Sequence, residues 1–266
     1  MKWWRDWRRR RVLQRSSVDE ECWHRTLAGP VFTGLSTVEQ ARLYDLTRLF
    51  MHEKSFTGAA GFVMDESTRL RIAAQASLLI LNLDLDRYAG WNEIIVYPDE
   101  FAPRREFRDE SGVVHEVRYP LLGEAWQGGP VIFSATDVDS SMLLDGANVV
   151  IHELAHKLDM QNGRANGLPP LHREVRVKDW AEAFSSAFAD FCLWVKEDGE
   201  TTINPYAATS PAEFFAVMSE AFFETPAILA AVYPAVYSQM KAFYRQDPLH
   251  RLPYSEGLNH IQHRPA

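Results

Sequence analysis

A short motif in the second half of the chain has the residue types and the spacing of a metal site. Residues 152–156 read His-Glu-Leu-Ala-His. On a helix, His152 and His156 project from one face about one turn apart, so their imidazoles can bind the same zinc ion. Glu153 is then placed to reach a zinc-bound water and act as its general base. The motif therefore predicts a zinc site with hydrolytic chemistry.

The residues around this motif favour a helix that buries most of its other faces. The preceding segment 146–151 is strongly apolar and has no helix breaker after Gly146. We expect Asp145 to be the N-cap and Asn162-Gly163 to end the helix. The predicted helix is thus four to five turns long.

A catalytic zinc usually has three protein ligands, and the chain after His156 indicates where the third does not lie. The metzincin pattern requires Gly three residues and His six residues after the second histidine. Asp159 and Asn162 occupy those positions, so that class is excluded. Asp159 shares the face of the two histidines, but three ligands on one straight helix converge poorly. We interpret Asp159 as a carboxylate that supports a ligand, or as a hydrogen-bond partner at the helix end.

The third ligand is therefore expected to be a downstream carboxylate on another helix. The candidates are Glu174, Glu182, Glu197, Glu200, Glu213, Glu220 and Glu224. Glu213 lies in an apolar helix, where an unpaired carboxylate is costly, and Glu220 lies two turns further along the same face. Ser210 and Glu213 also form a capping-box pattern, so Glu213 can only be a ligand if its side chain leaves the cap. The residues alone leave Glu213 and Glu220 as alternatives.

Long stretches of the chain resemble the Mlc titration factor A family. The resemblance runs from about Gly29 to Leu252, nearly the whole chain, whereas the first 20 or so residues match no pattern that we recognise. The stretches that carry the resemblance are residues 123–130 (GEAWQGGP), 151–159 (IHELAHKLD), 206–215 (YAATSPAEFF) and 243–249 (FYRQDPL).

The resemblance implies a zinc-dependent peptidase with aminopeptidase-type activity and a catalytic core similar to that of anthrax lethal factor. It also implies binding to the glucose-responsive repressor Mlc or an Mlc-like protein. The family's metal ligands fall on His152, His156 and Glu213, and its catalytic acid/base falls on Glu153. A tyrosine that faces the oxyanion falls on Tyr206.

Two further hypotheses compete with that of a peptidase. The chain can be a regulatory protein that sequesters a transcription factor, with hydrolysis secondary. It can also be a metal-free helical protein in which the motif is fortuitous. Tyr206 has a separate alternative, that of a loop tyrosine that covers the core.

The remaining patterns predict an α+β, zincin-like fold with a small central sheet beside the metal helix and flanking helices. Helices are expected at 36–52, 66–83, 178–194, 210–224 and 227–245, and strands at 93–97, 113–119 and 129–134. We expect residues 131–134 to form a sheet edge that holds the substrate backbone by strand addition. Residues 21–266 are predicted to be one domain, preceded by a basic arm at 1–20.

Composition limits the environment and the partners. The formal net charge of −8 argues against direct binding to nucleic acid, and the two cysteines fit a reducing, cytoplasmic location. No apolar stretch is long enough for a membrane span. The arm contains Trp3, Trp4 and Trp7 among arginines. We favour a helix that packs these indoles on the body over an arm that binds a partner or an interface.

Overall fold

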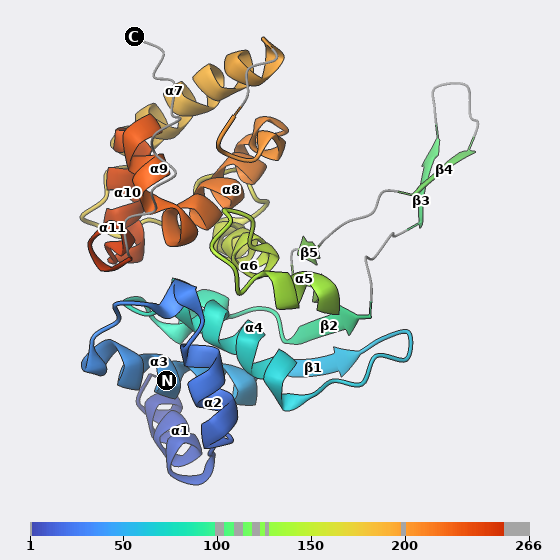
Figure 1. The fold of residues 1–266 in the computed structure, drawn as a ribbon, viewed down its shortest axis with the longest axis vertical. Helices are drawn as coiled ribbons and strands as arrows, with labels where there is room; N and C mark the ends of the chain where they lie inside the picture. The colour runs from blue at the N-terminus through green and yellow to red at the C-terminus, as the bar shows by residue number, and fades with distance from the viewer. Residues whose placement is uncertain are drawn as a thin grey trace.

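The computed structural model describes residues 2–98, 104–108, 114–118, 123–125, 128–197 and 201–252. Its N-terminal helices gather at one end of the molecule and its C-terminal helices at the other, with the predicted metal helix between them (Figure 1). A small sheet lies beside that helix. The mixed α and β composition agrees with the predicted class, although most of the described chain is helical.

The central sheet has four strands, β1 (Ser55–Gly58), β2 (Glu93–Tyr97), β6 (Val131–Ser134) and β5 (Gly123–Ala125), in that order. The first three are parallel, and β5 is antiparallel to β6. The prediction that 131–134 is a sheet edge is therefore wrong, because β6 pairs on both sides. All four of its residues are buried, which suits an interior strand. Among the strands that the structure describes, β5 borders this end of the sheet.

Two further strands, β3 (Arg104–Arg108) and β4 (Val114–Arg118), form a separate antiparallel pair. β4 confirms the strand expected at 113–119. Residues 126–127 of the stretch 123–130 lie outside the described residues.

Four helices build the N-terminal end: α1 (Lys2–Arg15), α2 (Glu20–Leu27), α3 (Thr37–Glu53) and α4 (Glu66–Leu79). The capping box of α3 is confirmed, since Ser36 accepts from the Glu39 amide and the Glu39 carboxylate accepts from the Ser36 amide. α4 lies between β1 and β2 in the chain and supplies the crossover that parallel strands require.

The short helix α5 (Ala135–Ser140) follows β6 and leads towards α6 (Val149–Asp159), the predicted metal helix. Single 3₁₀ turns occur at Pro30–Phe32 (η1), Leu85–Tyr88 (η2), Met160–Asn162 (η3) and Pro205–Ala208 (η4).

The C-terminal end contains α7 (Val177–Lys196), α8 (Pro211–Glu224), α9 (Pro226–Val232), α10 (Pro234–Tyr244) and α11 (Pro248–Arg251). The single helix expected at 227–245 is wrong, because the chain divides into α9 and α10 at Tyr233. Pro234 lacks an amide hydrogen and clashes with the preceding turn, so it starts a new helix instead of continuing the old one.

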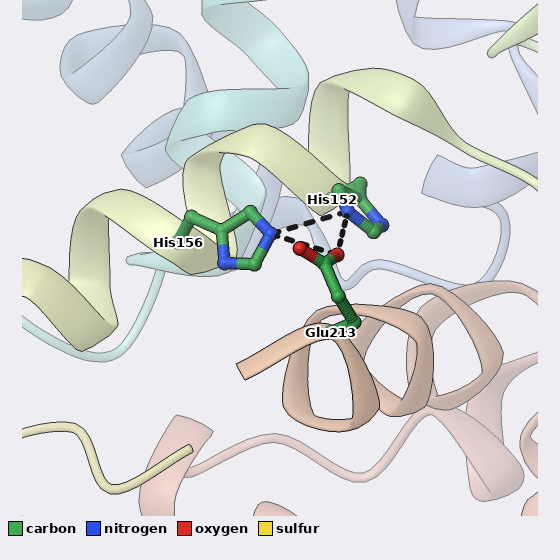
Figure 2. Close-up of side chains that lie close together, drawn as sticks. All are labelled: His152, His156 and Glu213. Atoms are coloured by element: carbon green, nitrogen blue, oxygen red, sulfur yellow. Dashed lines mark hydrogen bonds and ion pairs between the residues drawn. The ribbon is translucent and has the colours of Figure 1, made fainter. Parts of the chain in front are cut away.

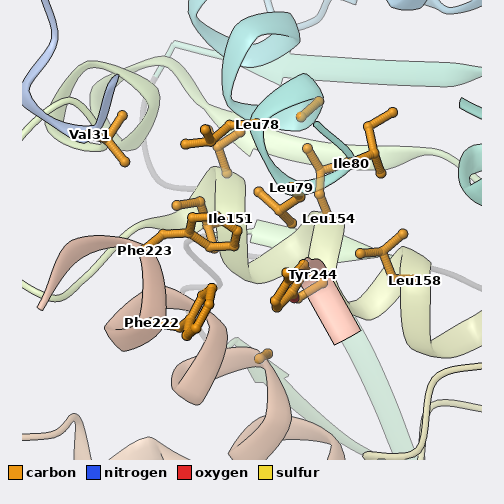
Figure 3. Close-up of a cluster of buried hydrophobic side chains, with 14 of the residues drawn as sticks. Val31, Leu78, Leu79, Ile80, Ile151, Leu154, Leu158, Phe222, Phe223 and Tyr244 are labelled. Carbon is orange, nitrogen blue, oxygen red and sulfur yellow. The ribbon is translucent and has the colours of Figure 1, made fainter. Parts of the chain in front are cut away.

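One hydrophobic core joins the two ends through α6 (Figure 3). Leu79 of α4 and Ile151 and Leu154 of α6 are fully buried, as are Phe222 of α8 and Tyr244 of α10. The buried Tyr244 hydroxyl has a partner, since it lies 2.8 Å from the Ser219 hydroxyl. The metal helix is thus a central element of the core.

The first helix does not pack its tryptophans on the body, so that prediction is wrong. Trp3 is 72%, Trp4 66% and Trp7 41% exposed. The opposite face of α1 meets the body instead, where Val12 and Leu13 pack against the core. None of the helices in the described part of the chain is long and apolar enough to cross a membrane.

Candidate metal centre

The metal helix α6 begins later than the sequence predicted. Asn148 is its N-cap, because the Asn148 side chain accepts a hydrogen bond from the Ile151 amide at 3.0 Å. Asp145 caps only the turn before it, through the Ala147 amide, and Gly146 has a φ of +87° that no helix allows. The helix therefore spans 11 residues, or about three turns, instead of four to five.

Three side chains from α6 and α8 meet at one point (Figure 2). Glu213 Oε2 lies 3.0 Å from His152 Nε2 and 3.2 Å from His156 Nε2, and the two nitrogens are 3.2 Å apart. Ligands at zinc bond lengths on the corners of a tetrahedron are about 3.3–3.4 Å apart. The triangle of donor atoms therefore has nearly the dimensions that a tetrahedral ion requires.

The hydrogen bonding of His152 leaves a lone pair for a cation. His152 Nδ1 lies 2.7 Å from Glu220 Oε1, and since an ionised carboxylate only accepts, Nδ1 carries the proton. In neutral His152, Nε2 then points an unprotonated nitrogen at the Glu213 carboxylate. Two acceptors that face each other repel unless a proton or a metal ion lies between them. The donor set thus fits a bound cation.

The pKa shifts of His152 and Glu213 also indicate that this cluster stabilises positive charge. Burial alone would lower the pKa of His152, but hydrogen bonds to Glu213 and Glu220 outweigh it and raise that pKa well above its ordinary value. Burial alone would raise the pKa of Glu213, but the two histidines lower it to about 2. Glu213 is therefore ionised at neutral pH.

The N-terminus of α8 places Glu213 in this position. The Ser210 hydroxyl caps the helix by accepting from the Glu213 amide at 3.2 Å. The carboxylate of Glu213 turns away from the cap and faces the two histidines. Only one half of the predicted capping box is formed, the bond from the Glu213 amide to the Ser210 hydroxyl. The Glu213 carboxylate is therefore available to the metal site.

Two further carboxylates of α8 hold the start of α6. Glu220 accepts from the Asn148 amide in addition to His152, and Glu224 accepts from Asn148 Nδ2 at 2.7 Å and from the Gly146 amide at 3.0 Å. Asn148 Nδ2 also donates to Gln75 of α4. Burial raises the pKa of Glu224 to about 8, with the nearby Glu220 charge adding to the effect.

From the sequence, Glu220 and Glu224 are predicted only as rival ligands, and no role is predicted for Asn148. Their shared spacing was the available signal, since Glu213, Glu220 and Glu224 recur at seven and four residues along one helix face. Asn148 lies four residues before His152, at the helix position where a side-chain acceptor is needed.

The far end of α6 is anchored by Lys157. Its ammonium donates to the Gly129 carbonyl at 2.8 Å and lies 5.1 Å from the centre of the Trp91 ring. Lys54 lies 3.8 Å from the centre of the same ring. Burial lowers the pKa of each lysine to about 8. The metal helix is thus held by polar contacts at both ends.

The two predicted catalytic side chains lie beside the ligands. Glu153 is buried, with 5% of its surface exposed, and its charge acts on both His152 and Lys157. Tyr206 lies in η4 and is 47% exposed. The centre of its ring is 6.1 Å from that of His152.

The other candidate ligands lie apart from the histidines or cannot be placed. Glu174 is 74% exposed at its side chain and pairs with Arg245, while Glu182 and Glu197 are exposed on or after α7. Glu200 lies outside the described residues. Asp159 accepts from the Asn166 and Gly167 amides at 2.7 Å each, so it is a hydrogen-bond partner at the helix end.

Comparison with known proteins agrees with a metallopeptidase-type centre of this kind. The chain belongs to the family described as glucose-regulated metallo-peptidase M90, whose model matches residues 4–245. This confirms the resemblance drawn from the sequence motifs and extends it towards the N-terminus, into the arm that those motifs left out.

The chain is also similar to proteins named Mlc titration factor A. It is 38% identical over 242 residues to that of Enterobacter sp. (strain 638), covering 89% of this chain and 90% of the relative. It is 38% identical over 260 residues to that of Salmonella typhimurium (strain LT2), covering 96% of this chain and 95% of the relative.

Proposed function

We propose that this protein is a zinc-dependent peptidase of the zincin type, with His152, His156 and Glu213 as the metal ligands. The observation that carries the proposal is the convergence of these three donor atoms from α6 and α8, within 4.8 Å of one another. Membership of a metallopeptidase family supports it. The choice of zinc follows from two imidazoles and one carboxylate, a donor set typical of catalytic zinc.

A bound zinc ion would supply a Lewis acid that acidifies a water molecule and polarises the scissile carbonyl. Glu153 follows His152 directly in α6, so its carboxylate takes the proton of the attacking water and passes it to the leaving amine. The Tyr206 hydroxyl, on the neighbouring η4, donates a hydrogen bond to the tetrahedral oxyanion.

We propose that the substrate backbone pairs with β5, the strand at the border of the sheet. Of the strands that the structure describes, it is the last on this side of the sheet, at Gly123–Ala125, and it contacts α6. An extended peptide that pairs with the outer edge of β5 lies across the metal helix. This replaces our expectation for residues 131–134, which pair on both sides. We propose short peptides and aminopeptidase-type cleavage, as the family resemblance implies.

Replacement of Glu153 by Gln tests the peptidase. We expect hydrolysis of a peptide library to fall by about 10²–10⁴-fold, the usual contribution of a general base. Zinc content, measured by elemental analysis, is expected to stay unchanged because Glu153 is not a ligand. Loss of the metal in this variant, or full activity, would contradict the role assigned to Glu153.

A second proposed function is binding of an Mlc-like repressor, which the names of the relatives support. The Glu153→Gln variant separates the two functions. A repressor-binding protein whose hydrolysis is secondary keeps its affinity for the repressor in this variant, as measured by titration calorimetry. A repressor that is recognised as a substrate is instead cleaved by the wild type and left intact by the variant.

A further inference from the structure

The outward face of α1 presents a cluster of exposed tryptophans. Trp3, Trp4 and Trp7 lie on one side of the helix, and their rings pack edge to face at centroid distances of 6.3 and 5.5 Å. Arg11 lies over the Trp7 ring at 4.8 Å. We call Trp3, Trp4 and Trp7 the tryptophan cluster. Such a large exposed aromatic surface is unusual on a folded domain and marks a site of contact.

The opposite face of α1 fixes the orientation of the helix. Arg9 donates to Glu53 at 3.0 Å, and it also pairs with Asp84 and Asp86. Arg48 of α3 donates to the carbonyls of Leu13 and Ser16 at 3.0 and 2.8 Å. These contacts hold the tryptophan cluster away from the body, so its exposure is built into the attachment of the helix.

Arginines with no ion-pair partner among the described residues surround the tryptophan cluster. Arg8, Arg10, Arg11 and Arg15 are exposed and form no ion pair with any residue that the structure describes. The segment 2–15 contains Asp6 as its one acidic residue, whereas the whole chain has a net charge of −8. Positive charge is therefore concentrated on this helix of an otherwise acidic molecule, and it calls for an anionic partner.

The shape of this surface favours a lipid bilayer over a protein as that partner. The cluster lies on one convex helix at the end of the molecule (Figure 1). Its indoles offer roughly 150–250 Å² each at most, which is less in total than the roughly 800 Å² that each partner buries in a stable protein complex. A bilayer deforms around single inserted side chains, and tryptophan prefers the headgroup level.

We propose that α1 docks this protein on anionic membrane surfaces, with the tryptophan cluster inserted among the lipid headgroups and the surrounding arginines on the lipid phosphates. The inner face of the helix stays on the body. The proposal is independent of the peptidase function, since none of these residues lies at the metal centre.

Sedimentation of the full-length chain with vesicles tests the proposal. We expect binding to vesicles of phosphatidylcholine with phosphatidylserine, and weak binding to phosphatidylcholine alone. The Arg8→Gln, Arg10→Gln, Arg11→Gln variant should lose about a hundredfold in affinity for the anionic vesicles. The Trp3→Ala, Trp4→Ala, Trp7→Ala variant should lose more than tenfold, and high salt should weaken the wild type.

Matched variants at other surfaces control for charge and apolar area. Replacement of Arg164, Arg173 and Lys178 by Gln removes the same charge from exposed positions elsewhere, and should leave vesicle binding unchanged. Replacement of Val63, Val177 and Leu193 by Ser removes exposed apolar side chains and should also have no effect. Circular dichroism verifies that each variant is folded.

Three outcomes would overturn the proposal. The first is no binding of the folded wild type to either kind of vesicle. The second is binding that the tryptophan and arginine variants leave unchanged. The third is a lack of vesicle binding together with a change of oligomeric state in the tryptophan variant, which would assign the surface to contact between copies of the chain.

Discussion

At the scale of single residues, His152 divides its two ring nitrogens between two carboxylates. Nδ1 lies 2.7 Å from Glu220, and Nε2 points to the predicted metal position beside Glu213. The bond to Glu220 fixes both the tautomer and the orientation of the ring. Supporting carboxylates of this type make the imidazole a better ligand.

We predict that Glu220→Gln weakens zinc binding by about 10–100-fold, the usual effect of removing such a support. Glu220 uses both oxygens as acceptors, one for His152 and one for the Asn148 amide. A glutamine has one acceptor oxygen, so its amide nitrogen must face one of these donors. Competition with a chromogenic chelator measures the affinity directly, without any activity assay.

Glu182→Gln is the control for this substitution, because Glu182 is an exposed residue of α7. It makes the same change of charge and should leave zinc affinity unaltered. Equal affinity in Glu220→Gln and wild type would show that Glu220 does not support the ligand.

Tyr206 permits a second prediction at this scale. If its hydroxyl stabilises the oxyanion, Tyr206→Phe lowers kcat by about 10²–10³-fold with little change in KM. Steady-state kinetics on a cleaved peptide measure both. Stability should barely change, because the residue is 47% exposed and the ring is retained. Full activity would leave Tyr206 as a packing residue, whereas a large fall in Tm would indicate a buried partner for the hydroxyl.

At the scale of elements, α8 packs against the metal helix α6 and forms the other side of the candidate metal centre. The start of α8 provides the proposed ligand Glu213. The second half of α8 provides Glu220 and Glu224, the two carboxylates that hold the N-terminus of α6. Glu224 is the most unusual of these, since burial raises its pKa from 4.5 to about 8. Glu220 on α8 and Asp145 before α6 are the charged groups that face it and add to this shift.

This shift predicts how stability depends on pH. The folded state binds the Glu224 proton more tightly than the unfolded state, so its contribution is most favourable below pH 4.5 and is lost as pH rises to about 8. Each pH unit in this window costs roughly 1.4 kcal/mol at most. In Glu224→Gln this contribution is absent.

Urea unfolding of both proteins from acidic to mildly alkaline pH, with EDTA present, measures the effect. The stability of the wild type should fall relative to that of the variant as pH rises. Because both proteins contain the same histidines, the effect of histidine titration cancels when the stability of one is subtracted from that of the other. Parallel pH profiles would contradict the raised pKa of Glu224.

The sequence predicts correctly those elements whose bounds are determined by residues close together in the chain. The capping box at Ser36, the strand at 93–97 and the start of α8 at Pro211 each depend on residues that are neighbours in the chain. The N-cap at Asn148 was missed because Asp145 is an equally good cap by type. Only the contacts of Asn148 with α4 and α8 distinguish the two.

The position of a strand within a sheet also depends on distant partners. Residues 131–134 have the composition of a strand, but their place between β2 and β5 follows from pairings that the sequence does not display. For the candidate site, the motif predicted the helix and its two histidines. The choice between Glu213 and Glu220 remained open because both lie on the same face of one helix.

At the scale of the whole molecule, the proposed metal site joins the central helix α6 to the C-terminal helix α8. The N-terminal helices contact α6 through α4, and the C-terminal helices contact it through α8. A zinc ion held by all three side chains would crosslink α6 and α8 in the folded state only.

We predict that zinc raises Tm and that EDTA reverses the increase. At a hundredfold excess over Kd, a ligand that binds only the folded state adds about 2.7 kcal/mol to the free energy of unfolding. Differential scanning calorimetry with and without zinc measures the shift. The Glu213→Gln variant should show a much smaller increase, and an equal increase in that variant would place the ion elsewhere.

The distance along the chain between the two sides of the metal centre matters while the protein is being made. His152 and Glu213 are 61 residues apart, and Asn148 and Glu224 are 76 residues apart. Because a ribosome releases the N-terminal end first, α6 emerges with its two histidines long before the third side chain exists. The complete centre cannot assemble on a nascent chain until α8 has been translated. Any reaction that needs this centre therefore cannot take place during most of the synthesis of the chain.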